Sequence, residues 1–212
     1  MTRTRAAQIA GYVAMVVVVL AVAVPLAWVV LTSFKERGDI YVQPAVWWPR
    51  VFAASNYSDA TTSVPFWRFL ANSVIVTGAL AIIKFVLGIA SAYGLVFLHF
   101  PFKRLIFVVV IAALMVPNQI TVIVNYSLVA QLGYRNTLLG IIVPLAGVAF
   151  GTFLMRNHFL SIPAEIIEAA RMDGAGHIRL LWRIILPLSG PTMVAFAVIT
   201  IVNEWNEYLW PF

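Results

Sequence analysis

The sequence predicts an all-α protein, a polytopic bundle of transmembrane helices. Hydrophobic residues make up 62% of the 212 residues, charged residues only 10%, and the mean hydropathy is +0.95. The apolar residues gather in runs of about 20, the length that a helix needs to cross a hydrocarbon core of about 30 Å. Because lipid satisfies no backbone polar group, these runs are expected to be helical, and about five of them are present.

The charge pattern argues against a nucleic-acid-binding protein. The net charge is +6, but the basic residues are scattered between the apolar runs and do not gather on one polar face. Such scattered charges are typical of those that orient a membrane protein. The chain has no cysteine, and His99, His158 and His177 lack the spacing of metal ligands, so we expect no metal site.

The first two apolar runs frame a polar loop. The first run covers residues 9–31, the loop covers residues 35–65, and the second run covers residues 66–97. Tryptophans in the loop suit the membrane interface. We therefore expect two domains, an N-terminal transmembrane helix with an extracytoplasmic loop at residues 1–65 and a transmembrane core at residues 66–212.

The third run, residues 105–130, is interrupted by Pro117, Asn118 and Gln119. A proline inside a helix removes a backbone hydrogen bond, which a membrane tolerates only where protein or a water-filled cavity satisfies the freed carbonyl. The break is therefore either an element of a solute pathway or an ordinary structural kink.

The fourth run covers residues 138–155, a polar stretch covers residues 156–190, and the fifth run starts at Pro191. The excess of lysine and arginine in short loops predicts which side of the membrane each loop faces. This excess favours a cytoplasmic amino terminus. The basic residues then on the cytoplasmic side are Arg3, Arg5, Lys103, Arg104, Arg156, Arg171, Arg179 and Arg183.

The polar stretch predicts two short helices at the membrane surface. Pro163 suits the first turn of a helix, and Gly174 suits a helix end. A second, amphipathic helix should run over residues 177–186 and end at Pro187. The pair is either a connector resting in the lipid headgroups or a docking element for a soluble partner.

A spaced motif in this stretch decides between the two. Glu168-Ala169-Ala170 is followed, after three intervening residues, by Gly174 and, after nine more, by Ile184, Leu186 and Pro187. This register resembles the EAA motif of ATP-binding-cassette (ABC) importer permeases, the inner membrane components of binding-protein-dependent transport. The resemblance covers about residues 66–212. It is strongest to the carbohydrate-uptake group with its maltose-type second permease and, within it, to permeases of glycerol-3-phosphate or glycerophosphodiester importers.

The resemblance implies a type I ABC importer permease fold and a multi-pass protein of the bacterial plasma (inner) membrane. Such permeases usually have six spans, and this chain ends after about five, so we expect either a fragment or an early stop. The implied partners are a second homologous permease, two ATP-binding cassette subunits, an extracytoplasmic solute-binding protein and membrane lipid. No G-x-x-x-x-G-K-[ST] loop is present. The chain is therefore expected to be no enzyme and to bind no cofactor, with ATP and Mg used by partner subunits.

In the family, the coupling loop docks into a cleft of the ATPase, and here it would cover about residues 158–190. Glycine permits a sharp turn there, and an exposed carboxylate can pair with a basic group of the partner. The resemblance assigns the coupling role to Glu168, Ala169, Ala170, Asp173, Gly174, Ile184, Leu186 and Pro187.

Ionisable residues inside the spans indicate a solute pathway, because a charge near a helix centre costs about 2.5 to 3.5 kcal/mol on insertion scales. Lys84 either faces an anionic solute or extends to the inner headgroups. The fifth span carries a polar arc that suits hydroxyl-rich solutes, although its two glutamates would repel a phosphate unless they contact glycerol hydroxyls or pack on the partner permease. The alternative is a polar arc at the outer interface that contacts no ligand. The pathway candidates are Lys84, Pro117, Asn118, Gln119, Glu204, Trp205, Asn206 and Glu207.

Another class of transporter competes with this interpretation. An ion-coupled secondary transporter would use Lys84, Glu204 and Glu207 as its proton or ion sites. A membrane-embedded enzyme is less favoured, since it would need catalytic carboxylates or histidines clustered at one interface.

Overall fold

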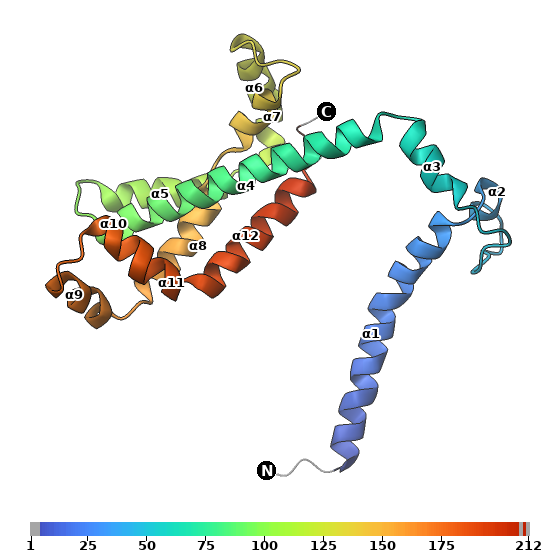
Figure 1. Ribbon diagram of the computed structural model, residues 1–212, viewed down its shortest axis with the longest axis horizontal. Helices are drawn as coiled ribbons and strands as arrows, with labels where there is room; N and C mark the ends of the chain where they lie inside the picture. The colour runs from blue at the N-terminus through green and yellow to red at the C-terminus, as the bar shows by residue number, and fades with distance from the viewer. Residues whose placement is uncertain (1–4, 208–209, 211–212) are drawn as a thin grey trace. The chain divides into compact units, whose positions relative to one another are not determined.

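The computed structural model describes residues 5–207 and residue 210, and every regular element in that part of the chain is a helix (Figure 1). The chain divides into two compact units, one ending at Phe69 and the other starting at Leu70. The prediction of an all-α membrane protein is confirmed: among the described residues, two helices are long and apolar enough to cross a membrane, and three bent helix pairs bring the possible spans to five.

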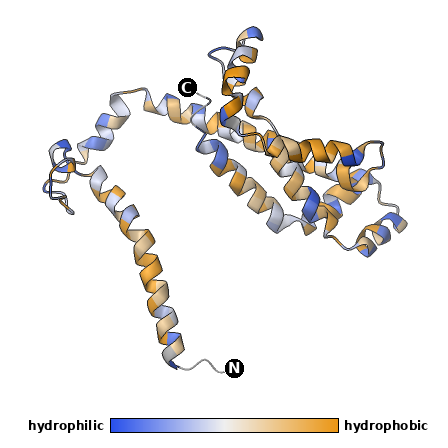
Figure 2. Ribbon diagram, turned by 180° about the vertical axis from the view of Figure 1, so that it is seen from behind, coloured by the Kyte–Doolittle hydropathy of each residue, from blue (hydrophilic) through white to orange (hydrophobic). Residues whose placement is uncertain are grey.

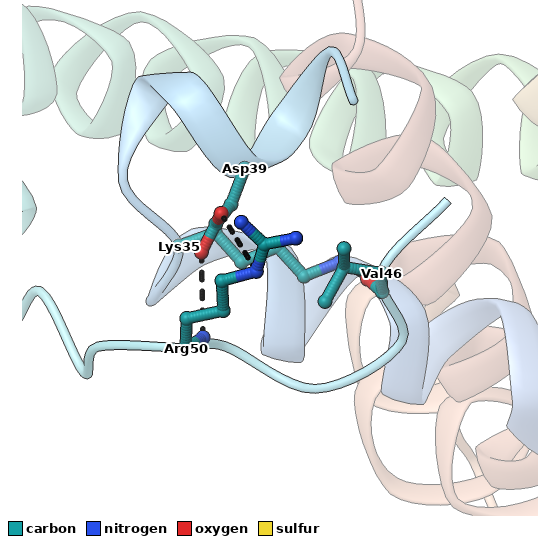
Figure 3. Close-up of polar contacts among 4 residues, drawn as sticks. All are labelled: Lys35, Asp39, Val46 and Arg50. Carbon is teal, nitrogen blue, oxygen red and sulfur yellow. Dashed lines mark hydrogen bonds and ion pairs between the residues drawn. The ribbon is translucent and has the colours of Figure 1, made fainter. Parts of the chain in front are cut away.

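The first unit contains α1 (Arg5–Ser33), α2 (Arg37–Ile40) and α3 (Ser55–Thr62). Helix α1 is hydrophobic along most of its length, and the polar residues follow it in the loop (Figure 2). In that loop Asp39 accepts a hydrogen bond from the backbone N–H of Arg50 at 3.3 Å and lies 3.7 Å from its Nε atom (Figure 3). The loop after the first span is thus folded on itself.

A buried lysine closes the same loop. The Lys35 side chain is 1% exposed, its Nζ atom donates to the Val46 carbonyl at 2.5 Å, and it lies 3.8 Å from the centroid of the Trp28 ring. The Asn56 side chain donates to the carbonyls of Ser33 and Lys35, both at 2.9 Å. A carbonyl and an aromatic face therefore satisfy this ammonium without a carboxylate.

The second unit carries most of the helices. In chain order they are α4 (Phe66–Phe97, from the end of the first unit onward), α5 (Lys103–Leu114), α6 (Asn118–Gln131), α7 (Leu138–Leu145), α8 (Ala149–Leu160), α9 (Ala164–Met172), α10 (His177–Leu180), the π-helix η1 (Leu181–Ile185), α11 (Leu186–Leu188) and α12 (Gly190–Trp205).

The third and fourth predicted spans are bent, and a further bend precedes the fifth. Helices α5 and α6 meet at 103°, with Pro117 extended at the break (φ −64°, ψ 133°). Helices α7 and α8 meet at 43°. Helix α7 ends one residue after Pro144, which has no backbone N–H to donate. The helix of residues 177–188 and α12 meet at 81°. The predicted proline break at residue 117 is confirmed.

Two predicted boundaries were wrong. The fourth span ends at Leu160 and not at residue 155, because Met155 and Phe159, four residues apart, both enter the core and keep the chain helical. The helix predicted to end at Pro187 continues to Leu188. Its π-turn makes the wider i to i+5 bonds just before the proline, which lacks an N–H to donate.

The core of the second unit lies among α4, α8, α12 and the coupling loop. The Phe196 ring is 1% exposed and stacks on Phe85 at a centroid distance of 5.7 Å. Glycines make room for it: a Cβ added at Gly151 would lie 2.1 Å from Phe196, and one added at Gly88 would lie 3.1 Å from it. Close approach of three helices here depends on residues without side chains.

Candidate functional site

A polar cavity of about 530 Å³ opens in the second unit beside this core. It brings together Lys84 of α4, Gln119 of α6 and Glu204 of α12, with Glu207 just beyond that helix. These candidates were predicted from three separate stretches of sequence. The other lining residues are Ala113, Leu114, Val116, Thr121, Val122, Asn125, Pro144, Leu145, Gly147, Val148, Ala149, Phe150, Gly151, Phe196, Thr200, Asn203 and Trp210.

An ion pair crosses the wall of the polar cavity. The Nζ atom of Lys84 donates to Oε1 of Glu204 at 2.5 Å, and the two side chains are 17% and 9% exposed. Their mutual attraction is strong where little water screens it, and it compensates part of the cost of burying each charge. Lys84 therefore pairs with a carboxylate inside the protein, so the alternative in which it extends to the headgroups is not what the structure shows.

Neutral polar groups complete the lining. Thr200 is buried one turn before Glu204 on α12, and Asn203 lies beside it on the cavity wall. On α6, the Asn125 side chain donates to Thr121 Oγ1 at 3.3 Å. Amide and hydroxyl groups can donate to or accept from a hydroxylated solute. Sequence reasoning missed Asn125 and Thr200, and the signal that marks them is a polar residue inside an apolar helical run.

Some predicted pathway residues lie elsewhere. Trp205 is 50% exposed, and the side chain of Asn206 donates to the Val202 carbonyl at 2.7 Å. Neither residue lines the polar cavity: Trp205 is turned by about 100° from Glu204, to the side opposite Asn203. Pro117 is exposed at the start of α6, and the side chain of Asn118 lies outside the described part of the chain. Trp210, whose Nε1 donates to the Gly140 carbonyl at 3.1 Å, lines the polar cavity instead.

The coupling loop forms the other candidate site. Helix α9 ends at Met172, and Gly174 takes a left-handed φ of +77°, a conformation that favours glycine. The backbone N–H of Ala175 donates to the Ala170 carbonyl at 3.0 Å, closing the helix end. The chain then reverses into α10, so the predicted pair of short helices is present.

The predicted coupling residues have two kinds of surroundings. Glu168, Ala169, Asp173, Gly174 and Pro187 are exposed. Ala170 and Leu186 are buried in the core of the unit, and Ile184 packs against it. The motif thus combines an exposed set available to a partner with a buried set that holds the loop on the spans.

One contact that sequence reasoning missed ties the coupling loop to α4. The Tyr93 side chain is 7% exposed, its Oη atom lies 2.8 Å from His177 Nδ1, and it donates to the His177 carbonyl at 3.2 Å. The two rings meet edge to face at 6.0 Å. A groove of about 740 Å³ between Phe97 and Arg171 adjoins this contact. These contacts join α10 directly to α4, one of the helices long and apolar enough to cross a membrane.

The described residues contain no group of three or more histidine, aspartate or glutamate side chains placed to hold a metal ion. The polar side chains at the two sites offer ion pairing and hydrogen bonding.

Comparison with known proteins gave matches over nearly the whole chain. Residues 84–211 match the family described as "Binding-protein-dependent transport system inner membrane component". The sn-glycerol-3-phosphate transport system permease protein UgpE of Agrobacterium fabrum is 34% identical over 212 residues, which cover 97% of this chain and 75% of that protein. The UgpE protein of Rhizobium meliloti is 33% identical over 208 residues, covering 95% of this chain and 74% of that protein.

A solved structure has the same fold. The crystal structure of a bacterial ABC transporter involved in the import of the acidic polysaccharide alginate superposes with a TM-score of 0.81 and 26% sequence identity. The match covers 99% of this chain and 75% of that chain.

Proposed function

The chain belongs to the family of binding-protein-dependent transport system inner membrane components, and from this premise we propose that it carries a hydroxylated anion of the glycerol-3-phosphate kind. As a family member it is a permease component of an ABC importer and not the ATPase. Its transmembrane helices place it in the membrane. The family does not support the ion-coupled alternative.

The observation that carries the substrate proposal is the chemistry of the polar cavity. Its wall presents one ammonium, carboxylates, and the amides of Gln119, Asn125 and Asn203. Glycerol-3-phosphate and alginate, the solutes named for the relatives, both combine acidic groups with hydroxyls. An ammonium suits the acidic group, while carboxylate and amide oxygens suit the hydroxyls. This division of roles removes the conflict that two glutamates pose for a phosphate-bearing solute.

We propose that a second homologous permease completes the pathway, that two ATP-binding cassette subunits hydrolyse ATP with Mg, and that a solute-binding protein delivers the solute. The coupling loop would face the ATPase subunits, and the amino terminus would then lie on the cytoplasmic side. Glu168 is exposed on α9 and available to pair with a basic group there. Alternating access then follows from differential binding of ATP-loaded partners to two arrangements of the spans.

The test is transport by proteoliposomes that contain this chain with its partner permease, ATPase and binding protein. We expect glycerol-3-phosphate uptake that requires ATP and survives dissipation of ion gradients. Glu168→Ala should remove the ATPase from the purified complex and abolish uptake. Glu165→Ala changes another exposed glutamate of the same helix and should do neither. Uptake that follows an imposed ion gradient without ATP would sink the proposal.

A further inference from the structure

Lys84 is the one basic residue among the described residues that line the polar cavity. Its charge is compensated by Glu204, and both side chains retain some exposure, 17% and 9%. A solute in the cavity can therefore reach the atoms of this ion pair. The pair joins α4 to α12 across a separation of 120 residues, so breaking it removes a contact between two spans.

We propose that Lys84 receives the acidic group of the solute, and that Glu204 is its resting counter-ion, displaced when the solute enters. The proposal rests on the proposed function and specifies which residue selects an anionic solute. Lys84 is then a specificity-determining residue, and Glu204 competes with the solute for it.

The exchange keeps every buried charge compensated. An ammonium in a water-poor cavity is costly without a counter-charge, and an arriving phosphate or carboxylate supplies one as the Glu204 carboxylate leaves. The freed carboxylate can in turn accept hydrogen bonds from the hydroxyls of the same solute. A solute with both groups replaces the whole ion pair, whereas a neutral polyol offers nothing to Lys84.

The surroundings of Lys84 differ from those of the buried lysine in the first unit. Lys35 is 1% exposed and is satisfied by a carbonyl and the Trp28 ring. That arrangement leaves no exchangeable anion and no access. Lys84 has an exchangeable carboxylate and a cavity beside it. If Lys84 had only a structural role, full burial against a carbonyl and an aromatic ring, as at Lys35, would stabilise it equally well.

Displacement predicts opposite effects of two variants on solute binding. In Glu204→Gln the competitor is neutral, so Lys84 should bind glycerol-3-phosphate at least about tenfold more tightly, since a charged hydrogen bond is worth a factor of ten or more. In the double variant Lys84→Gln, Glu204→Gln the wall stays polar and neutral, but the ammonium that binds the anion is gone. The affinity for glycerol-3-phosphate should therefore fall about tenfold below that of the wild type. Lys84→Arg keeps a positive charge and should bind glycerol-3-phosphate as the wild type does.

The measurement is equilibrium binding of radiolabelled glycerol-3-phosphate to the complete, detergent-purified transporter without its binding protein. Binding-protein-stimulated ATPase activity serves as the control for assembly and coupling. The expected order of affinity is Glu204→Gln, then wild type, then the double variant. Equal affinity of wild type and Glu204→Gln overturns the displacement of Glu204. An affinity in the double variant equal to that of the wild type overturns the assignment to Lys84. The single variant keeps the test valid should the double variant fail to assemble.

Failure of the proposed function has a different signature. A wild-type transporter that binds and imports a neutral sugar but no phosphate ester overturns both proposals together. A wild-type transporter that imports glycerol-3-phosphate while the double variant Lys84→Gln, Glu204→Gln binds it normally overturns only the role of Lys84.

Discussion

The two ends of the α4 and α12 pair are built on opposite principles. At one end Phe196 fills the space left by Gly88 and Gly151, and the rings and backbones are in close contact. At the other end, two turns along α12, the same helices are joined through the ion pair of Lys84 and Glu204 beside the polar cavity.

The difference indicates which end moves as a rigid body and which end can change its contacts. Phe196 and the buried residues of the coupling loop belong to one close-packed core. Because such a core resists deformation, we expect this end and the loop to move as one body. The ion-paired end is held by contacts that another anion can replace. Force from the coupling loop is thus expected to arrive at the cavity as a rigid movement of helix ends.

The largest effect is expected at Gly151. Alanine there would place its Cβ 2.1 Å from the buried Phe196 ring, so either the ring or the helices that hold it must shift. Overpacking of this kind costs about 1 to 3 kcal/mol. We expect a clear fall in the thermal unfolding midpoint of the purified transporter and loss of assembled complex.

Gly78→Ala is the matched control, because a Cβ at Gly78 meets nothing within 4 Å and helical alanine is favourable. Phe196→Leu combined with Gly151→Ala should recover part of the loss by restoring space. Equal unfolding midpoints for Gly151→Ala and Gly78→Ala would show that the packed end is not tight.

The next effect concerns the turn of the coupling loop. Gly174 has a φ of +77°, which costs an L-residue roughly 1 to 2 kcal/mol, so Gly174→Ala should distort the turn after α9. We expect several-fold weaker retention of the ATPase subunits and slower uptake. Gly176→Ala changes a glycine two residues away whose φ is −69° and should be tolerated. If the two variants retain the ATPase equally, the turn plays no part in docking.

The sequence predicts the spans well because their signal is local. The run at residues 66–97 coincides with α4, and the polar turn before α7 and the break at Pro117 lie where backbone chemistry places them. Pro187 misled the prediction, because the rule that proline ends a helix overlooks a preceding π-turn. Local rules also place Gly174 after a helix end without saying what the turn contacts.

The site was less predictable because its contacts join distant segments. From the sequence, Lys84 was expected either to face an anionic solute or to extend to the headgroups. Neither alternative included its partner Glu204, because that residue lies 120 residues away in the chain. The Tyr93 contact with His177 spans 84 residues and leaves no periodic pattern. Trp205 was chosen for its chemistry, but the helical phase turns it away from the cavity, where Trp210 lies instead.

A smaller effect is expected from the link between α4 and the coupling loop. Tyr93→Phe removes the hydrogen bonds to His177 but keeps the buried ring. Since His177 is exposed and water can replace the lost partner, the cost should be about 0.5 to 1.5 kcal/mol. Amide hydrogen exchange in α10 should speed up, and less solute should move per ATP. Tyr126→Phe, at an exposed tyrosine of α6, should change neither quantity.

The smallest effect tests whether polar contacts contribute to the tight end. The hydroxyls of Ser91 and Thr152 lie 2.6 Å apart between α4 and α8, next to the glycines that admit Phe196. Hydrogen bonds between transmembrane helices average about 0.6 kcal/mol in double-mutant cycles, because the separated helices find other partners in the membrane. A cycle of Ser91→Ala and Thr152→Val, read from unfolding in mixed micelles, should give a coupling energy of that size. A value well above the loss at Gly151→Ala would mean that polar contacts, and not packing around Phe196, hold this end together, and the contrast with the ion-paired end would disappear.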